Sequence, residues 1–138
     1  MRQTRCVRTP GQLLGDAAET TVAEHLAGAG WTVLARNVHV GRCELDIVAV
    51  DPGPPAVLVA VEVRWRARRD FGLAEETFDW RKRRRIRDAA FGLLDRGRLP
   101  DGRALPRLSL RFDLILVEPA ANRTGGPRIR HHRHVLGG

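Results

Sequence analysis

The sequence of 138 residues predicts a single α/β domain, in which a mixed β-sheet is flanked by helices. Three observations predict this class. Apolar residues recur at helical spacing in two segments, short strand-like runs lie between and after them, and a turn-forming DPGPP sequence separates two of these runs. A hydrophobic content of 43% is enough to form a buried core. The expected order is therefore helix, three strands, helix and strand.

The first helix is expected from residue 11 to residue 28, and Gly30 follows it as a stop signal. Its apolar stripe consists of Leu14, Ala18, Val22 and Leu26. Three strands (31–38, 44–50 and 56–65), a helix near 78–96 and a strand at 108–119 follow. The DPGPP turn makes the second and third strands an antiparallel hairpin. We expect a domain over residues 11–119, a flexible N-terminus at 1–10, and a basic C-terminal segment at 120–138 that can add a short edge strand.

The charge balance points to a polyanionic partner. The chain has 24 Lys and Arg against 16 Asp and Glu, which gives a net charge of +8, and Lys82 is its only lysine. Nucleic acid is the simplest partner for such a chain. No apolar run reaches the roughly 18 residues of a membrane span, and the N-terminus lacks the apolar region of a signal peptide. We therefore expect no membrane association and a cytoplasmic location, with Cys6 and Cys43 as reduced thiols.

Acids interrupt the apolar hairpin at Glu44, Asp46 and Glu62. Because strand side chains alternate between faces, Glu44 and Asp46 share one face of the second strand, and Glu62 and Arg64 share one face of the third. If Asp51 pairs with Val57 across the turn, the same register pairs Val48 with Ala60, Asp46 with Glu62 and Glu44 with Arg64. Asp46 and Glu62 would then lie with Cβ atoms about 5 Å apart. Two carboxylates so close repel each other unless a proton or a cation lies between them, and Mg²⁺ or Mn²⁺ fits oxygen ligands.

The first helix offers a third acid for the same site. Glu19 lies at the edge of the apolar stripe, so a helix packed on the sheet can direct it toward Asp46 and Glu62. The alternative is structural: the strand acids form salt bridges with Arg64 or Arg66 near a sheet edge. The shared face, the inward Glu19 and the basic composition favour a metal site.

The sequence also resembles a known group of proteins over residues 11–118. It resembles the PD-(D/E)xK nuclease superfamily, and within it the YraN-like, Holliday-junction-resolvase-like family of bacterial proteins. The motifs that carry the resemblance are GDAAE (15–19), ARN (35–37), RCELDIV (42–48), VAVEVRWR (59–66), FG (71–72), KRRRI with DAA (82–90) and RFD (111–113).

The resemblance implies a restriction-endonuclease-like core and a magnesium-dependent hydrolase that cleaves phosphodiester bonds, with DNA rather than RNA as the expected partner. It implies that Glu19, Asp46 and Glu62 are the metal ligands and catalytic acids. Two positions depart from the family pattern: Cys43 stands where a glycine is usual, and Arg64 stands where the superfamily places its catalytic lysine. Arginine can hold a phosphate and stabilise charge, but it cannot act as a general base near neutral pH. The alternative is therefore a nucleic-acid-binding protein that kept the nuclease fold and lost catalysis.

Two arginine-rich runs flank the proposed site and form a candidate phosphate-binding rim. Its members are Arg66, Arg68, Arg69, Arg81, Lys82, Arg84 and Arg85. The competing interpretation is a pair of solvated faces, or a basic helix that binds an acidic protein partner. Trp65 and Trp80 could stack on bases, although Trp65 falls on the apolar face of its strand. The histidines of HHRH (131–134) are too few for a zinc site. The oligomeric state is left open.

Overall fold

The computed structural model describes residues 10–65, 80–120 and 125–135, without the side chains of residues 10–14 and 80. The elements are α1 (Pro10–Gly28), β1 (Thr32–Val40), β2 (Cys43–Asp51), β3 (Val57–Trp65), α3 (Trp80–Arg96), β4 (Leu110–Glu118) and β5 (Arg128–His132). This order confirms the predicted α/β class, and the ends of the elements differ from the expected ones by only a few residues. The short last strand expected from the sequence is β5.

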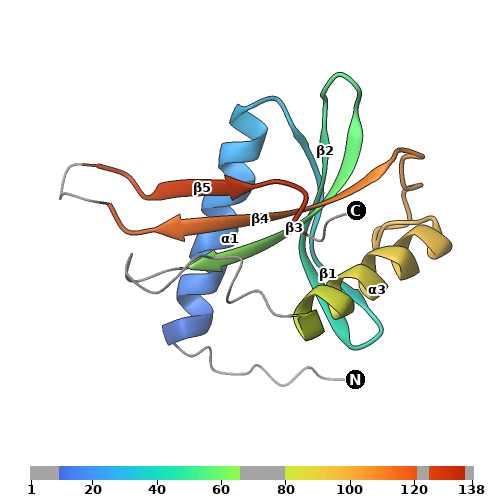
Figure 1. Ribbon diagram of the computed structural model, residues 1–138, viewed down its shortest axis with the longest axis horizontal. Coiled ribbons are helices and arrows are strands. Elements are labelled where there is room, and N and C mark those ends of the chain that lie inside the picture. The colour runs from blue at the N-terminus through green and yellow to red at the C-terminus, as the bar shows by residue number, and fades with distance from the viewer. Residues whose placement is uncertain (1–9, 66–79, 121–124, 136–138) are drawn as a thin grey trace.

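The sheet is mixed and follows the order of the sequence, β1-β2-β3-β4-β5 (Figure 1). Strands β3 and β4 are parallel, whereas the other neighbouring pairs are antiparallel. A parallel pair needs a long connection that returns the chain to the same end of the sheet, and α3 lies in this connection. Strands β1 and β5 are the two edges.

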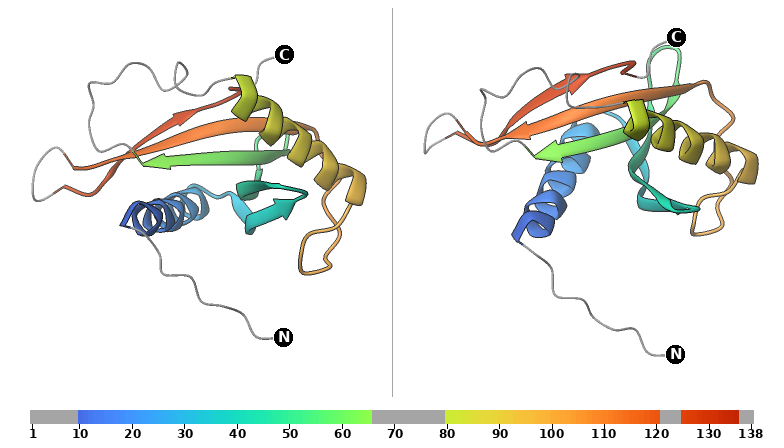
Figure 2. Two further views of the ribbon diagram at one scale, coloured as in Figure 1. Left: turned by 90° about the horizontal axis from the view of Figure 1, so that it is seen from below. Right: turned by 60° about the horizontal axis from the view of Figure 1, so that its bottom comes forward.

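The two helices cover opposite faces of the sheet (Figure 2). On one face α1 buries Ala18, Val22 and Leu26 against a layer formed by Ile47, Ala49, Val59, Val61, Ile115 and Val117. On the other face α3 buries Ile86, Ala89, Ala90 and Leu93 against Val48, Leu58, Ala60, Leu114 and Leu116. Each fully buried Val, Leu or Ile side chain stabilises the fold by about 1.5–3 kcal/mol before entropy is counted. Alternate residues of β2 and β3 therefore face the two helices in turn.

The predicted hairpin register is confirmed. Asp51 pairs with Val57 and Val48 pairs with Ala60, as the turn implies. The last paired residues are Ile47 and Val61, so the ladder between the two strands ends just before Asp46 and Glu62. This divergence opens the sheet at the position of the acids.

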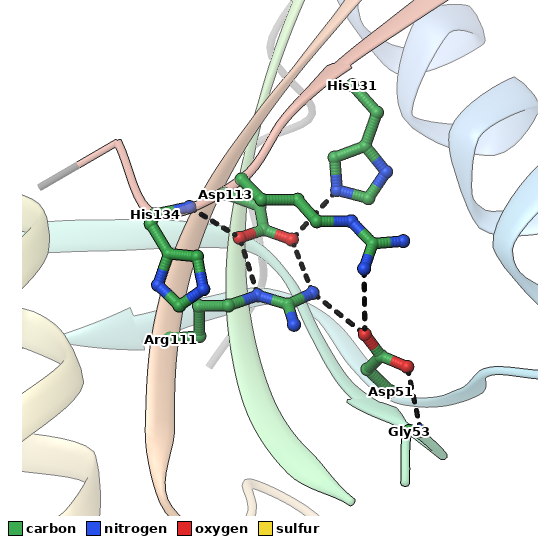
Figure 3. Close-up of polar contacts among 7 residues, drawn as sticks. Asp51, Gly53, Arg111, Asp113, His131 and His134 are labelled. Carbon is green, nitrogen blue, oxygen red and sulfur yellow. Dashed lines mark hydrogen bonds and ion pairs between the residues drawn. The ribbon is translucent and has the colours of Figure 1, made fainter. Parts of the chain in front are cut away.

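A buried polar cluster joins the ends of three strands on the α1 face (Figure 3). The guanidinium of Arg111 donates two hydrogen bonds to Asp113, at 2.9 and 2.8 Å, and forms an ion pair with Asp51 at 2.9 Å. Nε2 of His131 lies 2.8 Å from Asp113 Oδ2, and the backbone N–H of His134 donates to Oδ1 at 3.2 Å. Burial alone raises the pKa of Asp113, but the bonds from His131 and Arg111 outweigh it and lower the pKa. The cluster thus ties β2, β4 and β5 together.

Candidate active site

The candidate site begins where β2 and β3 separate. Beyond the Ile47–Val61 pair, the backbone N–H of Val63 donates to Asp46 Oδ2 at 2.8 Å. The carboxylate of Asp46 therefore takes the place of a β2 carbonyl in the ladder. From this position between two strands, the side chain can meet groups from both faces of the sheet.

Three further carboxylates gather around Asp46. One carboxylate oxygen each of Glu19, from α1, and of Glu44 and Asp46, from β2, lie within 4.8 Å of one another. Glu62 of β3 lies close enough to Asp46 for its charge to raise the pKa of Asp46. The amide of Asn37, oriented so that both of its ends are satisfied, donates to Glu19 at 2.8 Å and to Glu44 at 3.0 Å. The site therefore draws acids from a helix and two strands.

Burial and the neighbouring acids raise the pKa of two of these carboxyl groups, Asp46 and Glu19. Burial and the charge of Glu62 raise the pKa of Asp46 to about 8, against an ordinary value of 3.8, although the bond from Val63 lowers it. Burial also raises the pKa of Glu19. The positive charge of Arg36 lowers this pKa, whereas the nearby acids Glu44, Asp16 and Glu62 raise it further. Carboxylates crowded in this way need a proton or a cation to neutralise them.

The donor set fits a hard divalent cation. Carboxylate oxygens are the ligands that Mg²⁺, Mn²⁺ and Ca²⁺ prefer, and oxygens around one such ion are separated by at most about 4–5 Å. The separation of 4.8 Å or less among the oxygens of Glu19, Glu44 and Asp46 agrees with this geometry. Both Asp46 and Glu62 line an adjoining pocket of about 260 Å³, and water occupies about 30 Å³ per molecule in the liquid. The residues present therefore fit a hydrated metal ion.

Basic residues also line this pocket. The described residues that line it are Arg42, Cys43, Glu44, Asp46, Glu62, Lys82, Arg85 and Ile86. Nζ of Lys82, in the first turn of α3, lies 2.8 Å from Glu62 Oε1. Three basic and three acidic side chains thus line one small volume. This arrangement can hold a metal ion on one side and a phosphate group on the other.

The strand pair expected between Glu44 and Arg64 is not formed. The sequence register placed Arg64 opposite Glu44, beside the acids. Strand pairing does not extend that far, and Arg64 is not among the pocket-lining residues just given. It pairs with Leu116 of β4 on the side of β3 away from β2. Lys82, which the sequence assigned only to the phosphate-binding rim, contacts the strand acid Glu62.

The structure describes only some of the predicted rim. Arg81, Arg84 and Arg85 are exposed on α3, so they can meet a ligand in solvent. Arg66, Arg68 and Arg69 lie outside the described residues, as does the side chain of Trp80. Trp65 packs partly buried against the α1-side core, as its strand phase indicated. Cys43 is a free thiol at the pocket wall.

The sequence did not identify Glu44 as a metal ligand or Asn37 as a residue that positions the acids. Glu44 shares a strand face with Asp46, so the period of two alone could have included it. Asn37 has a positive φ of 52°, which asparagine tolerates better than most residues, and its amide spans Glu19 and Glu44. The motif ARN contained this residue, but nothing in the sequence showed which acids it would meet.

Comparison with known proteins decides the family. The model of uncharacterised protein family UPF0102 matches residues 18–117. The chain belongs to this family. UPF0102 is the YraN family of PD-(D/E)xK nuclease-like proteins, so the resemblance seen in the motifs is confirmed. The matched residues include every described member of the candidate site.

Several bacterial relatives carry the UPF0102 name. A protein of Symbiobacterium thermophilum is 37% identical over 107 residues, which cover 77% of this chain and 82% of the relative. One from Desulforamulus reducens is 32% identical over 124 residues, covering 89% of this chain and 94% of the relative. One from Sorangium cellulosum is 46% identical over 76 residues, and this match spans 55% of this chain and 51% of the relative. Across the described ranges, neither helix has the length and apolarity needed to cross a bilayer.

Proposed function

We propose that this UPF0102 protein is a divalent-metal-dependent endonuclease that hydrolyses phosphodiester bonds in DNA. The observation that carries the proposal is the pocket in which Asp46, Glu44 and Glu62 face Lys82, Arg85 and Arg42. Acids alone could bind a cation for structural reasons, and a basic surface alone could bind any polyanion. Their meeting in one pocket matches what phosphodiester hydrolysis needs, because the reaction combines a metal ion with an anionic substrate.

In this proposal, the acidic and basic side chains of the site have different roles. Asp46, Glu62, Glu19 and Glu44 would hold Mg²⁺ or Mn²⁺, which when bound would supply Lewis-acid activation of the phosphodiester. Asn37 orients two of these acids through its amide. Lys82 and Arg85 would hold the phosphate and stabilise the charge that develops on its oxygens. In this proposal, residues of α3 stabilise the charge on the phosphate. The superfamily pattern assigns that role to a lysine at the strand position of Arg64.

A second candidate is a nucleic-acid-binding protein without turnover, and Arg64 in place of lysine is the observation that favours it. A protein–protein adaptor that uses the basic face of α3 is the third. Location in the cytoplasm stays a prediction from the sequence.

One experiment separates the three. Purified protein is incubated with Mg²⁺ or Mn²⁺ and a panel of linear, nicked, flapped and four-way DNA, with EDTA and Asp46→Asn as controls. Metal-dependent cleavage that Asp46→Asn lacks supports the endonuclease. Salt-sensitive binding that is indifferent to metal, without cleavage, selects the second candidate, and no binding selects the adaptor. In the same assay, cleavage should fall further in Lys82→Met than in Arg64→Ala.

The basic rim leads to a separate prediction about the salt dependence of DNA binding. If Arg81, Arg84 and Arg85 contact phosphates, replacing all three with alanine should flatten the slope of log K against log[salt]. The slope changes by about 0.9 per phosphate contact on duplex DNA, so the expected change is up to about 2.7. Fluorescence anisotropy with a labelled duplex in EDTA measures this. The control replaces Arg96, Arg98 and Arg107, which are also basic residues of the described chain, and removes the same charge. Equal slopes in the two triple variants would assign the rim to a solvated face.

A further inference from the structure

Lys82 and a metal ion need the same carboxylate. Lys82 Nζ lies 2.8 Å from Glu62 Oε1, and the Glu62 side chain is only 8% exposed. Glu62 is also a proposed metal ligand. A second positive charge on one buried carboxylate is repelled by the first, because the Coulomb energy of close charges is large where water is scarce. The two cations therefore repel each other when both contact Glu62, and each weakens the binding of the other.

We infer that Lys82 is a built-in competitor for the metal, which occupies Glu62 in the metal-free protein and is displaced when the metal binds. This inference rests on the proposed function, because it takes Glu62 to be a metal ligand. The ammonium partly neutralises Glu62 in the pair with Asp46 and so stabilises the empty pocket. The metal does the same with two charges instead of one.

The geometry allows this exchange. The Lys82 side chain is 38% exposed, so it reaches Glu62 from the solvent side of the pocket and can leave without unpacking the core. Lysine carries its charge on a flexible four-carbon chain, whereas a planar arginine head is harder to move. Arg42 and Arg85 line the same pocket and can hold an anion with the released ammonium. Metal binding would thus make a third cation available to the phosphate, and the pocket would take substrate best when the metal is present.

Calorimetric titration with Mg²⁺ tests the competition. Lys82→Met removes the competitor and should tighten Mg²⁺ binding by about five- to tenfold, in the range expected for a partly exposed ion pair. Arg85→Gln is the matched control, since it removes one positive charge from the same pocket wall and should change affinity less than about threefold. Lys82→Arg keeps the charge on a head that is harder to displace, so this variant should bind Mg²⁺ no more tightly than wild type. Equal tightening in Lys82→Met and Arg85→Gln would reduce the effect to net charge and overturn the inference.

A second measurement does not depend on substitution. Lys82 is the only lysine, so protein labelled with ¹⁵N,¹³C-lysine gives a single set of side-chain NMR signals. Addition of Mg²⁺ should shift the Lys82 ε signals with the midpoint found by calorimetry, and Glu62→Gln should remove most of the shift. Mg²⁺ binding with unmoved Lys82 signals would overturn the inference while leaving the proposed function intact. Absence of Mg²⁺ binding in wild type and in every variant would overturn both.

Discussion

Asp46→Asn is expected to abolish detectable Mg²⁺ and Mn²⁺ binding and, without metal, to stabilise the protein at pH 8. Asparagine keeps an oxygen that can accept the hydrogen bond from the backbone N–H of Val63, so the local backbone should be preserved. The substitution removes the negative charge of Asp46, which is repelled by the negative charges of Glu62 and Glu19. Calorimetry measures the loss of metal binding, and urea unfolding across a pH series measures stability.

The pH dependence follows from the raised pKa of Asp46. In the folded protein this pKa is about 8, against an ordinary 3.8, so the folded state holds the proton more tightly. Stability from this group is fully present below about pH 4 and is lost as the pH rises toward 8, by up to about 1.4 kcal/mol per pH unit. Asp46→Asn lacks this loss, so its stability should fall less over the same range. Mg²⁺ should stabilise wild type at pH 8 by mass action and leave the variant unchanged.

Asp88→Asn is the control, because Asp88 is an exposed acid on α3 outside the pocket. It should leave both metal affinity and the pH profile of stability as in wild type. Retention of wild-type metal affinity in Asp46→Asn would remove the acid cluster from the proposed mechanism.

Arg111→Met is expected to destabilise the protein by about 3–5 kcal/mol, because it leaves buried carboxylates without their main partner. Arg111 and Asp113 are 8% and 1% exposed, and the guanidinium serves Asp113 and Asp51 together. Methionine replaces the aliphatic portion of the side chain, which limits the loss of packing. Arg111→Lys should destabilise the protein less than Arg111→Met, because it keeps the positive charge and loses only the bidentate contact with Asp113. Urea unfolding followed by circular dichroism gives both values.

A solvent-exposed ion pair provides the comparison. Asp101 and Arg103 form such a pair at 2.6 Å, with both side chains more than half exposed. Asp101→Asn should leave the unfolding midpoint almost unchanged, because surface pairs are screened by water. A loss below about 1 kcal/mol in Arg111→Met would show that the cluster in Figure 3 contributes little to stability.

Several features of this protein were determined by the sequence alone because they depend on local rules. The DPGPP turn and the period of two set the hairpin register, so the pairs Asp51–Val57 and Val48–Ala60 could be predicted. The same phase put Asp46 and Glu62 on one face, and the helical stripe put Glu19 near its edge. The motifs carried the family and the α/β class for the same reason, since most of the motif residues that the structure describes lie within single elements.

Tertiary structure decided what depends on contacts between distant segments. The end of the ladder at Ile47 and Val61 lets Asp46 join acids from both faces, and no local pattern encodes where two strands separate. The packing of α3 brings Lys82 to Glu62, whereas alternation along β3 could point only to Arg64. The RFD motif likewise acquired a role only when β5 placed His131 beside Asp113. Charge and hydrogen bonding act at a few ångströms, and residues far apart in sequence reach that range only through the packing of whole elements.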